Sequence, residues 1–91
     1  MNVSEEAERF GRQIREFRIS RGLSQMQLAE TAGCSQRFVS ELERGKATAE
    51  LGKALDVASA LGLTPLLVPG PNRNVAATAQ PAPKRHLADY L

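Results

Sequence analysis

The chain has 91 residues, of which 42% are hydrophobic and 24% charged, a composition typical of a single globular domain. Its net charge of +2 is too small to indicate nucleic-acid binding by itself. Residues 1–68 hold nine Lys/Arg and nine Asp/Glu, so a basic face there would have to come from segregation of charge and not from a surplus. A single cysteine excludes an internal disulfide framework, and the absence of a long apolar run or a signal-peptide pattern predicts a cytoplasmic protein.

The first predicted element is a helix that begins at Ser4 and ends at Gly22. Ser4 is a favourable N-cap, and the acidic residues just after it suit the positive end of the helix dipole. Apolar residues recur at intervals of three and four and predict one buried face: Ala7, Phe10, Ile14 and Phe17. Five arginines lie on the other faces: Arg9, Arg12, Arg15, Arg18 and Arg21. We expect the first three to form a solvated surface.

Residues 23–45, LSQMQLAETAGCSQRFVSELERG, have the spacing of a helix-turn-helix. Ala29 is small, as required where two helices cross, and Gly33 can adopt the positive φ that ends a helix. Val39 and Leu42 are three residues apart and would form the buried stripe of the second helix. These offsets together indicate a motif that places side chains in a DNA major groove.

Two serines predict where the helices of this motif begin. Ser24 is expected to cap a helix over residues 25–32, and Ser35 a helix over residues 36–44 that stops at Gly45.

A fourth helix is expected from Ala49 to about Leu61, with Thr48 as its cap and Gly62 just after its end. Its inward residues are predicted to be Leu51, Leu55, Ala58 and Leu61. Short helices with short connections predict an all-α, lambda-repressor-like bundle of four to five helices.

Residues 63–68 break the helical pattern and have the composition and length of a strand, with Pro65 confining the strand to an edge. The chain offers no second strand, so we expect pairing with the same strand of a twofold-related copy. The predicted dimerisation residues are Leu63, Leu66, Leu67 and Val68. The alternative is an extended segment that lies on its own helical bundle.

Residues 69–91 are rich in Pro and Ala and predict a flexible tail that follows a DNA-binding domain over residues 1–68. Near its end, Leu87, Tyr90 and Leu91 have helical spacing. They are either a short docking motif that orders on a partner or an end that makes no contact.

Few residues could support catalysis. His86 is the single histidine and lies in the tail, and Cys34 occupies a turn where a small apolar residue is expected. One Cys and one His cannot form a zinc site alone. We therefore expect no enzyme activity, no metal and no cofactor.

The sequence supports DNA recognition better than it supports catalysis. The residues expected to contact base edges lie in the first turns of the second motif helix: Ser35, Gln36, Arg37 and Ser40. Gln can bind adenine and Arg can bind guanine with two hydrogen bonds each. Phe38 would either touch a thymine methyl or pack on its neighbours. Glu41 and Glu43 should point away from DNA and pair with Arg37 or Arg44.

Phosphate contacts are expected at the start of the first motif helix and from nearby cations. The candidates are Gln25, Arg18, Arg21 and Lys46. Ordinary surface solvation is the alternative for Lys46.

On these residues, segment 10–62 resembles the lambda-repressor/Cro-type (XRE family) helix-turn-helix proteins, most closely in LSQMQLAETAG and SQRFVSELERGK. The continuation ATAELGKALDVASALGLTPLLV is similar to HipB-like antitoxins. This resemblance implies a homodimeric repressor that reads an inverted-repeat operator and pairs with a HipA-like Ser/Thr kinase toxin. It gives Gln36, Arg37 and Ser40 the role of base readers.

The same resemblance implies phosphate contacts from Gln25 and Lys46 and an intermolecular sheet that includes Leu66 and Val68. Pro65 within that strand and the long tail depart from the HipB-like pattern. A stand-alone XRE-type regulator, or an interaction module that acts mainly through its tail, is the alternative.

Overall fold

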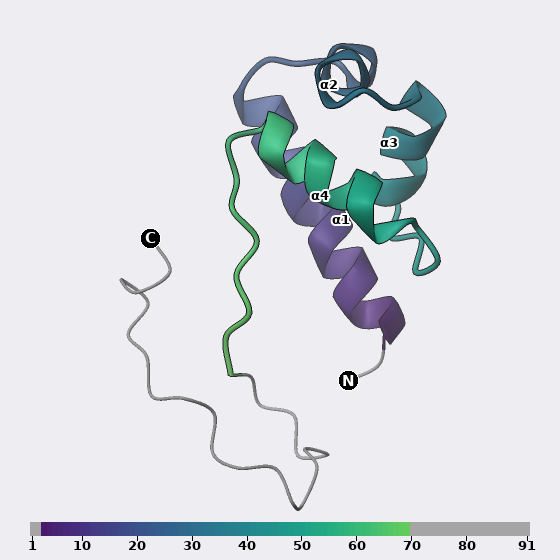
Figure 1. The fold of residues 1–91 in the computed structure, drawn as a ribbon, viewed down its shortest axis with the longest axis vertical. Coiled ribbons are helices and arrows are strands. Elements are labelled where there is room, and N and C mark those ends of the chain that lie inside the picture. The colour runs from purple at the N-terminus through teal and green to yellow at the C-terminus, as the bar shows by residue number, and fades with distance from the viewer. Residues whose placement is uncertain (1–2, 70–91) are drawn as a thin grey trace, which may run out of the picture.

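The structure is a computed structural model that describes residues 3–69, and this part of the chain contains four helices and no strand (Figure 1). The helices are α1 (Val3–Ser20), α2 (Gln25–Ala32), α3 (Gln36–Glu43) and α4 (Leu51–Ala60). The helix α2 packs on both α3 and α4, while α1 packs on α3. The all-α prediction is confirmed for the described residues. The predicted tail motif and residues 70–91 lie outside them.

One apolar core joins the four helices. Its largest fully buried side chains come from all of them: Ile14, Leu28, Leu61, Val39 and Val57. Ala29 is buried where small size was expected, and Leu42 is buried beside Val39 in the predicted stripe. The helix-turn-helix spacing therefore correctly predicted which face of each motif helix is buried.

The predicted caps of the motif helices are confirmed. The Gln27 N–H donates to Ser24 Oγ at 3.0 Å and the Ser24 N–H donates to Gln27 Oε1 at 2.8 Å, which forms a capping box. Gly33 ends α2 in the left-handed region, with φ of 76°. At the start of α3, the Phe38 N–H donates to Ser35 Oγ at 3.0 Å.

Two predicted helix starts are wrong. The first helix already includes Val3, so Ser4 lies within its first turn and not at the N-cap. The fourth helix begins at Leu51, with Glu50 in the N-cap position in place of Thr48. The physical reason is an additional turn before α4, in which the Ala49 N–H donates to the Lys46 carbonyl at 3.2 Å.

The inward face of α4 also differs from the prediction. Leu51 is 69% exposed, while Ala54 and Val57 are buried together with the predicted Ala58 and Leu61. The buried face follows the spacing i, i+3, i+4 and i+7, and Leu51 lies at the edge of this face, where α4 begins.

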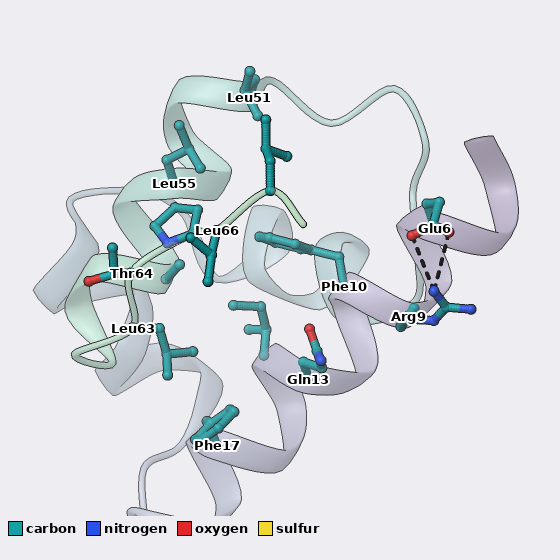
Figure 2. Close-up of a pocket in the computed structure, with 14 residues that line it drawn as sticks. Glu6, Arg9, Phe10, Gln13, Phe17, Leu51, Leu55, Leu63, Thr64 and Leu66 are labelled. Carbon is teal, nitrogen blue, oxygen red and sulfur yellow. Dashed lines mark hydrogen bonds and ion pairs between the residues drawn. The ribbon is translucent and has the colours of Figure 1, made fainter. Parts of the chain in front are cut away.

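Leu51 and Leu55 line an apolar groove of about 580 Å³ between α1, α4 and the chain after α4 (Figure 2). From α1 come Phe10 and the 40% exposed Phe17, which was predicted to be buried. The extended residues 63–67 line the groove on the remaining side, and Leu66 among them is half-buried. In the single chain this segment therefore lies along its own bundle, and its pairing with a second copy stays a prediction.

A close approach of α1 to the end of α3 occurs at Gly11, which is buried. A Cβ at this position would overlap the Leu42 carbonyl oxygen and lie 2.9 Å from that of Glu43. Gly45 approaches α1 as well, since a Cβ there would lie 2.8 Å from the Glu8 Cα. These contacts place α3 against the first half of α1.

Candidate nucleic-acid interface

The predicted base-reading residues lie at the start of α3. Ser35, Gln36 and Arg37 are exposed there, and Ser40 is half-buried one turn later. Their arrangement follows from the Ser35 cap and from the buried stripe, which turns the opposite face of the helix to solvent. Arg37 is the most prominent, with a side chain that is 88% exposed. The short α3 thus presents an amide and a guanidinium, the two groups best suited to adenine and guanine.

Glu41 holds two cations of this surface. Arg37 Nε donates to Glu41 Oε1 at 2.9 Å, as predicted, and Lys46 Nζ donates to Glu41 Oε2 at 2.7 Å. These hydrogen bonds, first that from Lys46 and then that from Arg37, hold the pKa of Glu41 below its usual range. Arg37 and Lys46 are therefore brought together through one carboxylate.

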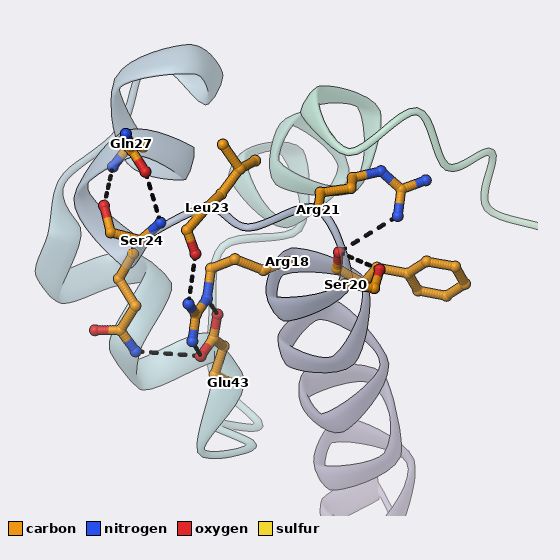
Figure 3. A network of polar contacts seen from close by, with 9 residues as sticks. Arg18, Ser20, Arg21, Leu23, Ser24, Gln27 and Glu43 are labelled. Carbon is orange, nitrogen blue, oxygen red and sulfur yellow. Dashed lines mark hydrogen bonds and ion pairs between the residues drawn. The ribbon is translucent and has the colours of Figure 1, made fainter.

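A second carboxylate, Glu43, joins three helices beneath the surface (Figure 3). It is buried, and its two oxygens accept from Arg18 Nε at 2.6 Å and Arg18 Nη2 at 3.0 Å. Gln25 Nε2 also donates to Glu43, at 3.1 Å, and Arg18 Nη1 donates to the Leu23 carbonyl at 2.8 Å. The hydrogen bond from Arg18 to Glu43 raises the pKa of Arg18, against the opposing effect of burial.

This network corrects the expectation for Arg18. An arginine contacts a phosphate only if its guanidinium is exposed and has free donors, but the Arg18 side chain is only 12% exposed and its donors bind within the protein. Its position instead supports a role in holding α1, α2 and α3 together. Glu43 is buried away from the exposed face of α3, in agreement with the prediction that it points away from DNA, but its partner is Arg18 and neither Arg37 nor Arg44.

The other phosphate candidates lie in different places. Gln25 is half-buried in the first turn of α2, where helix amide groups favour an anion. Arg21 lies on the other side of α1 from the Glu43 network, with its guanidinium 5.2 Å from the Phe17 ring centroid (Figure 3). Its Nη1 donates to the Phe17 carbonyl at 3.3 Å. The structure therefore does not bring Arg21 together with Arg37 and Lys46.

Phe38 and Cys34 both pack against the core and are half-buried. Lys53 Nζ lies 5.9 Å from the Phe38 ring centroid, so this aromatic side chain has neighbours within the protein. Burial raises the pKa of the Cys34 thiol, which disfavours the thiolate needed for nucleophilic chemistry. These contacts favour a role in packing for both Phe38 and Cys34.

Other kinds of site find little support within residues 3–69. In this part of the chain, no group of three or more His, Cys, Asp or Glu side chains could hold a metal ion. None of its helices has the length and the apolar composition needed to cross a membrane.

Comparisons with known proteins agree with the geometry of α2 and α3. Residues 9–69 match a family described as a helix-turn-helix domain. The chain is also 42% identical over 64 residues to the uncharacterised HTH-type transcriptional regulator y4mF of Sinorhizobium fredii. That similarity covers 69% of this chain and 84% of the relative.

Proposed function

The chain belongs to the XRE-type helix-turn-helix family and is a DNA-binding regulator, and on this basis we propose that it is a sequence-specific repressor. The proposal assigns base reading to the first turns of α3. The observation that carries it is the exposed guanidinium of Arg37 beside Gln36 at the start of that helix.

Arg37 would bind guanine O6 and N7, and Gln36 would bind adenine N6 and N7. Ser35 and Ser40 would add single hydrogen bonds to neighbouring bases. These four residues would supply the sequence preference, because base contacts carry the sequence information. Residues 1–68 carry no net charge and offer little general attraction to DNA, so the same contacts would also contribute much of the affinity.

Phosphate contacts would come from Lys46, from Gln25 and from the amide groups at the start of α2. Lys46 lies three residues after the end of α3 and is exposed. Arg21 would reach only a more distant phosphate, since it lies on the other side of α1.

We further propose that the repressor is a homodimer that forms across the groove between α1 and α4. Leu67 is 92% exposed and lines the groove together with the half-buried Leu63 and Leu66. Val68, which is 61% exposed, follows this segment and adds to the apolar surface. A patch of this kind favours burial against a second apolar surface. An edge strand over residues 63–68 could pair with its twofold copy and satisfy its backbone groups.

Replacing Leu67 with Asp should therefore shift the protein from dimer to monomer, since it would bury a charge in the interface. Sedimentation measures the shift, and Ile19→Asp is the matched control because Ile19 is exposed but lies outside the groove. The expected half-sites of the operator lie about 34 Å apart, so Leu67→Asp should weaken binding to the inverted repeat far more than to one half-site. A wild-type protein that is monomeric at micromolar concentration would contradict the dimer.

The finer proposal is that this regulator is the antitoxin of a type II toxin–antitoxin operon and neutralises a HipA-like Ser/Thr kinase. It rests on the similarity of residues 47–68 to HipB-like antitoxins. Co-purification of a kinase encoded in the neighbouring reading frame would support it, and purification of the regulator alone would favour a stand-alone role. If the tail forms the docking site, removing residues 70–91 would abolish kinase binding and leave DNA binding intact.

A further inference from the structure

Glu41 is an acidic residue in the middle of a surface proposed to bind a polyanion. Its carboxylate is the most covered member of the group, since its side chain is 21% exposed against 49% for Lys46 and 88% for Arg37. Each carboxylate oxygen accepts from a different cation, Oε1 from Arg37 and Oε2 from Lys46. The half-buried carboxylate of Glu41 therefore anchors both a candidate base reader and a candidate phosphate contact.

The hydrogen bond to Glu41 leaves the guanidinium of Arg37 able to bind a base. The bond to Glu41 uses Nε, so the two terminal nitrogens stay available for the paired acceptors of guanine. A guanidinium held at Nε also has fewer rotamers to lose when it binds a base. This arrangement favours a bidentate contact over a loose contact with a phosphate.

Glu41 holds Lys46 at two points. Besides the side-chain pair, the Lys46 N–H donates to the Glu41 carbonyl at 3.1 Å, which fixes the chain just after α3. The Glu41 carboxylate also lowers the net charge of this cluster: Arg37 and Lys46 alone would carry two positive charges, and with Glu41 a single positive charge is left. General attraction to DNA phosphate is weakened accordingly.

We infer that Glu41 is a specificity-determining residue that orients Arg37 toward bases and restrains Arg37 and Lys46 from binding phosphate at any sequence. The inference rests on the proposed DNA-reading role of α3. In this account Glu41 does not touch DNA; it acts through Arg37 and Lys46. Its removal should therefore strengthen binding to unrelated DNA while it reduces the preference for the correct site.

The test compares Glu41→Ala and Glu41→Gln with wild type on two duplexes of equal length. One duplex is the sequence that wild-type protein enriches from a random pool, and the other is its scrambled form. For Glu41→Ala we expect about tenfold loss of preference between the two duplexes, tighter binding to the scrambled one, and a salt dependence steeper by about one ion. Glu41→Gln keeps an acceptor for Arg37 without the charge, so it should retain more of the preference.

Glu30→Gln is the matched control, because Glu30 is an exposed acid of α2 and its removal changes the net charge equally. It should change the affinity for both duplexes by the same factor. A double variant separates positioning from a general structural effect: in an Arg37→Ala background, Glu41→Ala should no longer alter the preference. Circular dichroism confirms that each variant is folded.

The inference is overturned if Glu41→Ala leaves the preference unchanged, or if it weakens both duplexes equally. A wild-type protein that enriches no sequence would instead overturn the proposed base reading by α3, and the inference with it. The two failures are thus distinguished by the wild-type result alone.

Discussion

Replacing Glu43 with alanine is expected to destabilise the domain by about 3–5 kcal/mol, the usual cost of removing one partner of a buried ion pair. The Arg18 side chain is 12% exposed and that of Glu43 is 3% exposed, so Arg18 would keep its charge with little access to water. Gln25 would lose its acceptor at the same time. Urea denaturation followed by circular dichroism measures the change.

The charge of Arg18 is responsible for most of this cost, so the double variant Arg18→Met/Glu43→Leu should recover much of the stability. The exposed pair of Glu6 and Arg9 is the control, since both side chains are about half exposed and Glu6→Ala should cost less than about 1 kcal/mol. If Glu43→Ala unfolds within about 0.5 kcal/mol of wild type, the network does not hold the helices together.

Gly11→Ala is the second substitution with a large expected effect. The new methyl group would overlap the Leu42 carbonyl oxygen, and neither atom can move without the helical backbone to which it is attached. The helices α1 and α3 would have to separate, which typically costs about 1–3 kcal/mol. This loss exceeds the gain of up to about 1 kcal/mol that alanine brings to a helix interior.

Gly52→Ala makes the same change in α4 and is the matched control. There the nearest atom to a new Cβ is Glu50 Oε1, at the end of a flexible exposed side chain. Alanine at this position should be neutral or stabilising, by up to about 1 kcal/mol. The thermal midpoints of the two variants should therefore shift in opposite directions. A Gly11→Ala protein as stable as wild type would contradict the close helix approach.

Local patterns in the sequence predicted most of the fold. The caps at Ser24 and Ser35 and the turn at Gly33 are decided by residues within a few positions of each other, so they can be inferred without a structure. The stripe of Val39 and Leu42 was predicted by helical spacing alone. The start of α4 was not predicted correctly, because it depends on a hydrogen-bonded turn that no capping residue signals.

Contacts between distant segments were missed. Glu43 was expected to pair with Arg37 or Arg44 along its own helix, and its burial was not predicted, although it lies four residues after Val39 on the same helical face. Its partner Arg18 comes from another helix, and this pairing has no local signal. Gly11 had a signal that was not used: glycine within a helix is unfavourable, so its presence indicates a close approach.

The candidate site was predicted in part. Helix geometry placed Gln36 and Arg37 at the exposed start of α3, because the cap and the buried stripe define that surface. The joining of Arg37 to Lys46 through Glu41 could not be predicted, because it depends on the path of the chain after α3. The same holds for the position of Arg21, which follows from the direction in which α1 ends.

We propose above all that α3 reads DNA bases through Arg37. The most direct test is selection from a random duplex pool with the wild-type protein and with Arg37→Ala, using Arg15→Ala as a control for the loss of one exposed positive charge from α1. We expect wild type and Arg15→Ala to enrich the same inverted repeat. Arg37→Ala should lose preference at one base pair of each half-site, at a cost of about 1–3 kcal/mol. Equal weakening by Arg37→Ala at every sequence, with the preference intact, would show that Arg37 contacts only phosphate and would contradict the account.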